Sequence, residues 1–287
     1  MKLRVLLLLI IFSSCEESSY IPVPNVSNKP VLNLLMNKDS VMLARLTLST
    51  PLAGYFQMDE IKNGVVNLYE NGAFIETLTP VTLNYRTYYQ SNTLARAGAT
   101  YRVTAAAPGY PEVSGSDHIP DTVRPGEMKM ITMPTDNLNT QATVSVQIHD
   151  DPAVQNYYRI RFFQVIEWRD NNGNIRRDRS LQYFDTEDAG LPIFSDDTES
   201  DFYTTDALFN GRSPRFTFRM NLSYMDKKLV AEITALTFDS YNYLNSAYMA
   251  ARKNDDGFSE KVIVYNNILN GLGIIGGQAK RDYEIVR

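Results

Sequence analysis

Cys15 is the only cysteine in the 287-residue chain, and its position suggests lipid chemistry. It follows a short basic segment, Met1 to Arg4, and an apolar run from Val5 to Phe12, which together are typical of a signal peptide. Ser13 and Ser14 stand directly before the cysteine. Small residues are typical of this position in lipoproteins, where the cysteine thiol takes a diacylglycerol and the signal peptide is cut before it. Phe12 replaces the usual leucine. We therefore expect a signal peptide over residues 1–14 and a lipidated Cys15. The alternatives are a transmembrane anchor, for which the run is too short, and a secretory peptide with an incidental cysteine.

Two acidic residues follow the predicted lipid site. Glu16 and Glu17 resemble the surface-export signal of Bacteroidota lipoproteins, and ordinary linker acidity is the alternative. The rest of the segment to Pro30 is polar and contains three prolines, so residues 15–30 are expected to form a semi-rigid tether.

The sequence offers little for metal or nucleophilic chemistry. Its two histidines, His118 and His149, have no companion at metal-ligand spacing, and the single thiol is assigned to the lipid. No Gly-x-Ser-x-Gly motif marks a hydrolase, although a triad built from distant residues stays open. We expect no catalytic residue, no metal site and no cofactor.

An acidic stretch is the strongest remaining chemical signal. Three interpretations stay open: a solvated loop, which we favour, a calcium site, and a carboxylate pair for glycoside cleavage. The spacing matches no known calcium loop, and 170–174 also departs from the EF-hand pattern. The acidic residues are Asp185, Glu187, Asp188, Asp196, Asp197, Glu199, Asp201 and Asp206.

Composition predicts a folded, mostly β body. The chain is 44% hydrophobic and 21% charged, which suits a globular protein, and its 18 tyrosines favour pleated, half-buried surfaces. The formal net charge of −5 supplies no basic field to hold nucleic acid. We therefore do not expect the protein to bind nucleic acid.

The first part of the body, residues 31–125, is expected to form an immunoglobulin-like β-sandwich. Asn71 and Gly72 separate two β-rich runs, 65–70 and 73–78, which is a strong signal for a hairpin with a type I′ turn. Another strand is expected at 101–105, where hydrophobic residues alternate. The proline-rich segment 120–126 marks the boundary.

The second part, residues 126–287, is expected to form another antiparallel sandwich or a barrel-like domain. Strict alternation of apolar and polar residues marks its strands. The apolar faces are Ala142, Val144, Val146 and Ile148; Tyr158, Ile160, Phe162, Ile166 and Trp168; Phe216, Phe218, Met220 and Leu222; and Leu229, Ala231, Ile233 and Ala235.

One helix is expected, near residues 239–253. Asp239 or Ser240 can cap its amino end, and Arg252 and Lys253 suit its carboxyl end. An apolar stripe runs along one face at helical spacing. We favour core packing for this stripe over an aromatic ligand platform; its members are Tyr241, Leu244, Tyr248 and Ala251.

A glycine-rich motif closes the chain. Gly271, Gly273, Gly276 and Gly277 permit close approach of the backbone. A phosphate-binding loop would also need a following Lys-Ser/Thr pair and a long helix, and the sequence offers neither. The motif therefore favours a bulged or tightly packed last strand.

Several segments together resemble domain-of-unknown-function family 4249, a group of Bacteroidota outer-membrane lipoproteins, over nearly the whole mature chain. They are 107–114 with Ile119-Pro120, 150–153 with 156–160, 195–197, 208–211, 241–244, and 265–277, which is the most specific of them; Ile275 stands where an aromatic residue is expected.

The resemblance implies a location and a class of partner, but no catalytic residues. It implies a lipid-anchored, surface-exposed protein of the outer membrane that works with a TonB-dependent transporter to capture an unknown nutrient. A structural or adhesive surface lipoprotein is the main alternative, and a hydrolase that uses the acidic stretch is a third.

Overall fold

The computed structural model describes residues 28–50, 59–135, 139–186, 199–223, 228–253 and 260–285. Within these ranges no helix has the length and apolar character needed to cross a membrane. The elements are β1 (Pro30–Asn37), β2 (Val41–Leu48), β3 (Val65–Glu70), β4 (Ala73–Thr77), β5 (Thr79–Leu83), β6 (Arg86–Leu94), β7 (Thr100–Ala106), β8 (Val113–His118), β9 (Pro125–Pro134), β10 (Asn139–Ile148), β11 (Tyr157–Arg169), β12 (Ile175–Gln182), β13 (Phe202–Thr205), η1 (Asp206–Leu208), β14 (Arg215–Ser223), β15 (Lys228–Leu236), α2 (Phe238–Lys253) and β16 (Leu272–Ile285).

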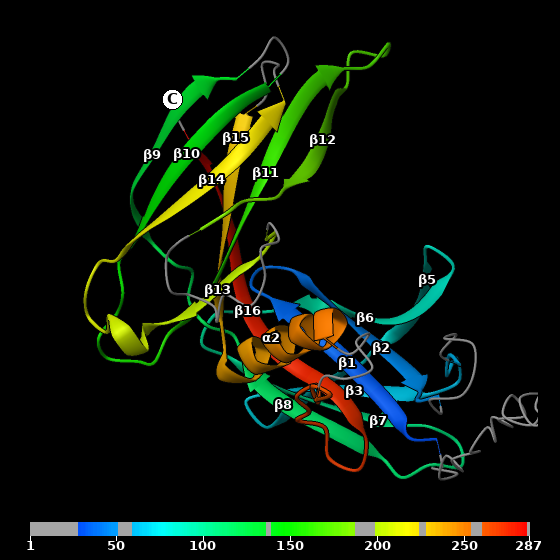
Figure 1. Ribbon diagram of the computed structural model, residues 1–287. Coiled ribbons are helices and arrows are strands. Elements are labelled where there is room, and N and C mark those ends of the chain that lie inside the picture. Colours follow the sequence, from blue (N-terminus) through cyan, green and yellow to red (C-terminus); the bar gives the residue numbers. More distant parts are fainter. Residues whose placement is uncertain are drawn as a thin grey trace, which may run out of the picture.

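One large sheet runs through the whole molecule (Figure 1). Its strand order is β12-β11-β15-β16-β1-β2-β6-β5, and β13 pairs with β11. The long strand β16 connects its two halves. Residues 272–278 of β16 pair in parallel with β1, and residues 278–285 pair antiparallel with β15. The two halves therefore share one continuous strand.

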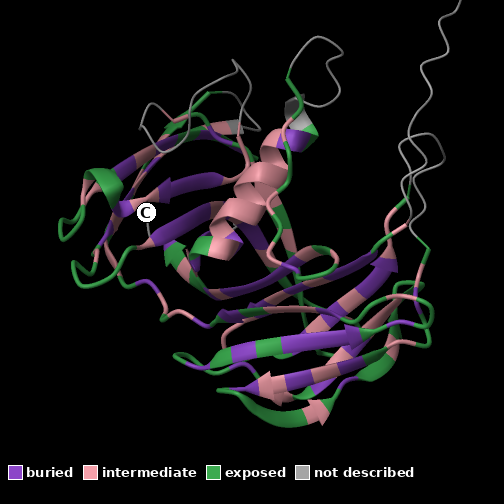
Figure 2. Cartoon of the chain, turned by 90° about the horizontal axis from the view of Figure 1, so that it is seen from below, coloured by how far each residue is buried: buried purple, intermediate pink, exposed green. Residues whose placement is uncertain are grey.

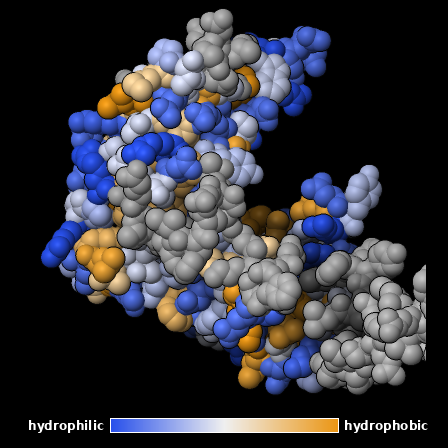
Figure 3. Space-filling view, in the orientation of Figure 1, coloured by the Kyte–Doolittle hydropathy of each residue, from blue (hydrophilic) through white to orange (hydrophobic). Residues whose placement is uncertain are grey.

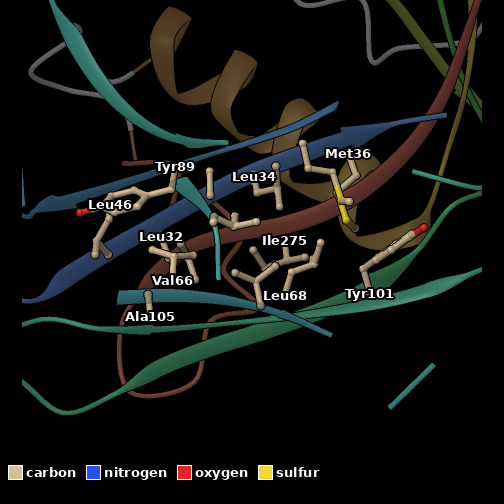
Figure 4. Close-up of a cluster of buried hydrophobic side chains, with 14 of the residues drawn as sticks. Leu32, Leu34, Met36, Leu46, Val66, Leu68, Tyr89, Tyr101, Ala105 and Ile275 are labelled. Atoms are coloured by element: carbon tan, nitrogen blue, oxygen red, sulfur yellow. The ribbon is translucent and has the colours of Figure 1, made fainter. Parts of the chain in front are cut away.

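A second sheet covers one half of the large sheet to make the N-terminal sandwich. Its order is β4-β3-β7-β8, and alternate side chains of both sheets meet in one core. In Figure 4 Leu32 and Leu34 of β1 face Val66 and Leu68 of β3 across this core. Ile275 of β16 lies in the same core, so the last strand of the chain helps to close the first sandwich.

The C-terminal sandwich packs the three-stranded sheet β14-β10-β9 against the other half of the large sheet. Phe162 of β11 and Phe218 of β14 meet with ring centroids 4.9 Å apart, and Phe184 packs edge-on against both rings. Figure 2 shows the buried residues gathered on the strands of both sandwiches. In the space-filling view the two lobes diverge around a hollow (Figure 3).

The prediction of a mostly β chain with antiparallel sheets is confirmed. Asn71 and Gly72 form the expected hairpin turn between β3 and β4, with φ of 50° and 85°. The predicted apolar faces of β10, β14 and β15 are buried or half-buried. The predicted apolar face of β11 is not buried along its whole length, because Trp168 near the end of the strand is exposed.

Two expectations need correction. A division into 31–125 and 126–287 does not describe β16, because residues 272–278 lie in the sheet of the first sandwich. The helix begins at Phe238, and its cap is Thr237, whose hydroxyl oxygen accepts the Ser240 amide at 3.2 Å. Asp239 and Ser240 therefore lie inside the first turn. The side chains of Arg252 and Lys253 fall outside the described residues.

Candidate functional site

A groove of about 870 Å³ lies where the two sandwiches meet. Its walls come from the segment that links the sandwiches, from the loop between β10 and β11, and from the turn between β15 and α2. The lining includes His118 to Arg124, His149 to Asp151, Val154 to Tyr158, and Ala235 to Phe238. The volume falls in the range of small-molecule sites, which are often found between domains.

The groove combines an apolar floor with an open, partly aromatic mouth. Tyr157, Leu236 and Val123 line it and are buried. At the mouth, Val154 and Phe238 expose more than half of their surface. Phe238 meets the Tyr157 ring edge-on, at 5.8 Å between centroids. Apolar surface of this kind, with a few polar groups around it, is typical of a ligand pocket.

The structure brings both histidines to this groove, which the sequence did not predict. His118 ends β8, and its Nδ1 lies 3.2 Å from Oδ1 of Asp117. His149 follows β10, and its Nδ1 lies 2.8 Å from the Ser213 hydroxyl. No three His, Cys, Asp or Glu side chains of the described ranges lie together as metal ligands would.

A set of hydrogen bonds fixes the groove wall formed by the β10–β11 loop. The Tyr158 hydroxyl donates to Oδ1 of Asp150 at 2.5 Å, and the Gly211 amide donates to Oδ2 at 2.8 Å. Burial, followed by this bond to Asp150, raises the pKa of Tyr158. The Asn156 amide donates to the buried carboxylate of Asp206 at 2.8 Å. These hydrogen bonds therefore fix the conformation of the groove wall.

Asp117 joins the two sandwiches beside the groove. Its carboxylate accepts hydrogen bonds from the Thr237 hydroxyl, from the Gly277 amide at 2.7 Å and from the His118 amide at 2.8 Å. Burial raises the pKa of Asp117, and these hydrogen bonds oppose that rise. Because the donors come from three separate elements, this single side chain connects β8, the start of α2 and the middle of β16.

Two glycines of the closing motif allow β16 to approach its neighbours closely, and Gly277 does so at the joint made by Asp117. A Cβ on Gly277 would lie 1.7 Å from the His118 carbonyl oxygen, and one on Gly273 would lie 2.2 Å from the Leu32 carbonyl oxygen. The expectation of a tightly packed last strand is thus confirmed. Asn267 fixes the segment that precedes β16. Its side-chain amide forms hydrogen bonds with both the backbone amide and the carbonyl of Ile275.

The aromatic stripe of α2 packs against the sheet. Tyr241, Leu244 and Tyr248 contact a small buried cluster on the strands, which includes Tyr157 and Tyr203. The expectation of core packing is confirmed for these three residues. Ala251 is exposed and takes no part in it.

The other predicted site residues are dispersed or lie outside the described ranges. Cys15, Glu16 and Glu17 lie outside them, and so do Glu187, Asp188, Asp196 and Asp197. Of the remaining acidic residues, Asp206 is buried in the groove wall, and Asp201 lies beside arginines of β11. The calcium interpretation of the stretch stays a prediction.

The groove could not be predicted from the sequence, because its walls come from segments that are far apart in the chain. The sequence does mark two of the segments that form the groove. Turn residues at 119–125 and 150–152 interrupt the strand pattern where the chain passes between the two sandwiches. Turn residues predict where strands end, but they do not predict which turns lie next to each other in the folded chain.

Comparison with known proteins places the chain in a family. No curated protein matches the sequence. The model of one family, described as a domain of unknown function (DUF4249), matches residues 21–284. This match covers both sandwiches, the joint and the groove, so the chain belongs to the DUF4249 family.

Proposed function

We propose that this protein is a surface-exposed outer-membrane lipoprotein that binds a nutrient without catalysis and assists a TonB-dependent transporter. The observation that carries the binding role is the groove between the sandwiches, with its apolar floor and its exposed Phe238 and Val154. The groove wall is held by hydrogen bonds from loops on both sides, and binding residues are often found on loops that a rigid scaffold supports.

The location is inferred from the N-terminal sequence. The apolar run before Cys15 and the acidic pair Glu16-Glu17 support a lipid anchor and an outward-facing body. A diacylglycerol with an added acyl chain supplies enough buried hydrocarbon for stable attachment. A tether from Glu16 to Lys29, just before β1, spans at most roughly 50 Å, which lets the body lie over a neighbouring barrel.

The non-catalytic role is supported by the structural part that two carboxylates play at the groove and beside it. Asp150 accepts hydrogen bonds from Tyr158 and Gly211, and the carboxylate of Asp117, behind His118, accepts three. Each of these side chains holds two chain segments together.

One observation favours a second role as an adhesive surface protein. Strand β9 is an edge of its sheet and pairs only with β10 within the described residues. Its Ile131 and Met133 are exposed. An exposed apolar edge can accept another strand, so β9 offers a surface for contact between cells or proteins.

Replacing Phe238 with Ala should weaken ligand binding in the groove. The aromatic face at the mouth would be lost, so we expect about a tenfold loss of affinity, on the order of 1.4 kcal/mol. The measurement is calorimetric titration of the purified chain with a panel of oligosaccharides and oligopeptides, followed by titration of each binder against the variant.

Phe74→Ala is the matched control. Phe74 is 56% exposed and Phe238 is 54% exposed, and each meets a tyrosine ring edge-on. Phe74 does not line the groove, and it lies on β4, at the opposite edge of its sheet from β8, whose His118 does line it. Its loss should therefore leave affinity unchanged. Equal affinities of the two variants would show that the ligand does not use the groove.

A further inference from the structure

Four cationic side chains gather on the C-terminal half of the large sheet, on the face turned away from the sandwich core. They are Arg159 and Arg161 of β11, Arg179 of β12 and Lys280 of β16, and we call them the cation belt. Ile160 and Phe162 alternate with the two β11 arginines and point into the core. The strands that carry the belt lie in one sheet with β15 between β11 and β16 (Figure 1).

The belt surrounds Glu232 of β15, which is only 2% exposed. Arg161 forms hydrogen bonds to this carboxylate, Arg179 Nη2 lies 3.2 Å from it, and Arg159 Nη2 and Lys280 Nζ each lie at 3.7 Å. Burial acts to raise the pKa of Glu232, but the hydrogen bond and charge of Arg161, with Lys280 and Arg159, hold it below its ordinary value. The carboxylate is therefore ionised at neutral pH.

The belt has more positive charge than its partners neutralise. Besides Glu232, the carboxylates in contact with it are Asp282, bound by Arg179 at 2.8 and 3.0 Å, and Asp201, at 3.9 Å from Arg159 and Arg161. Four cations thus face three carboxylates within the described part of this face. The excess charge is one positive unit.

Arg159 forms no hydrogen bond to the carboxylates around it, although its guanidinium donates one to the Tyr203 hydroxyl. Its side chain is only 9% exposed, and its distances of 3.7 to 3.9 Å to the carboxylates exceed a hydrogen bond. The Nε atoms of Arg159 and Arg179 are buried and find no hydrogen-bond acceptor among the described residues. A buried guanidinium donor without an acceptor is costly, so a further acceptor that reached these atoms would be stabilised.

The belt is also accessible and held in place. Arg161, Arg179 and Lys280 keep 24%, 31% and 40% of their side chains exposed. The guanidinium of Arg179 stacks 3.7 Å from the centre of the Phe163 ring, and that of Arg161 lies 5.4 Å from it. Such stacking fixes the planes of guanidinium groups, which suits them for paired hydrogen bonds to an oxyanion.

We propose that the cation belt is a binding site for an oxyanion, namely a carboxylate, sulfate or phosphate group of a solute. Charge-assisted hydrogen bonds from planar guanidinium groups match the geometry of these anions, and the excess positive charge supplies attraction. None of the four residues lines the groove at the joint. The site is therefore a second one and does not depend on the membrane anchor or on the transporter.

Calorimetric titration of the purified full chain with sodium sulfate, inorganic phosphate and citrate tests this site. Sodium chloride keeps the ionic strength constant. We expect saturable binding of at least one of the three anions, and the order of affinities distinguishes the carboxylate, sulfate and phosphate sources. Arg159→Gln should abolish the binding. Lys280→Gln, which removes one exposed charge, should weaken it about threefold to tenfold.

Arg215→Gln is the matched control, because it removes one positive charge from β14 in the opposite sheet, where Arg215 pairs with Glu127. It should leave anion affinity unchanged. Absence of saturable binding for all three anions would overturn the proposal, and so would an equal loss in Arg215→Gln and Lys280→Gln. Should Arg159→Gln lose its β-rich circular dichroism, the Lys280→Gln comparison decides the question.

Discussion

Gly277→Ala should leave little folded protein, although it adds a single methyl group. The new Cβ would lie 1.7 Å from the carbonyl oxygen of His118 and 3.3 Å from the Thr237 side chain. The carbonyl is backbone at the end of β8 and cannot rotate away as a side chain could. Relief would require β8 and β16 to separate, which would break the buried hydrogen bond from the Gly277 amide to Asp117.

The expected cost is on the order of 4 kcal/mol or more, because overpacking is combined with loss of a buried hydrogen bond. That is a large fraction of the roughly 5–15 kcal/mol by which an ordinary domain is stable. Urea unfolding followed by circular dichroism measures the change. Gly126→Ala is the control, because its added Cβ would meet only the side-chain ends of Gln147 and His149. A wild-type midpoint for Gly277→Ala would refute this account of the joint.

Cys15→Ala should release the body from the membrane almost completely. The proposal places the membrane anchor at this lipid, and within the described ranges no helix is long and apolar enough to span a bilayer. Each buried methylene contributes about 0.8 kcal/mol, so loss of two or three acyl chains removes far more than the remaining contacts supply. Fractionation of cells into membrane and soluble pools, with a C-terminal tag for detection, makes the measurement.

Replacement of both Glu16 and Glu17 with Ala provides the comparison. This variant keeps the thiol, so it should stay in the membrane fraction while it becomes hidden from protease added outside the cells. If Cys15→Ala stays membrane-bound with its leader intact, the lipid anchor is wrong. If the double variant stays accessible to protease, the acidic pair has no role in display.

The sequence predicted the local structure well where one face of a strand is buried. In β10 the residues Ala142, Val144, Val146 and Ile148 alternate with polar ones, and all four are buried. Asn71 and Gly72 predicted a hairpin because each adopts positive φ at low cost. In these cases the residues that carry the signal are neighbours in the chain.

The sequence could not predict long-range pairing. The glycines at 271–277 indicated close approach, but not that the approaching atoms belong to Pro30, Leu32 and His118. The cap of α2 was placed late because Asp239 and Ser240 are both good caps, whereas their side chains bind Tyr265 and the Gly277 carbonyl instead. The groove and the cation belt were missed for the same reason, since each unites residues from separate segments.

The central claim is the partnership with a TonB-dependent transporter, and affinity isolation from native outer membranes tests it most directly. The C-terminally tagged chain would be expressed at its native level, crosslinked, extracted in mild detergent and analysed by mass spectrometry. A stable interface buries on the order of 1,200–2,000 Å², enough to survive such extraction. The account predicts that a TonB-dependent transporter is recovered with the chain. Recovery of the chain alone after crosslinking would contradict it and favour the adhesive or structural role.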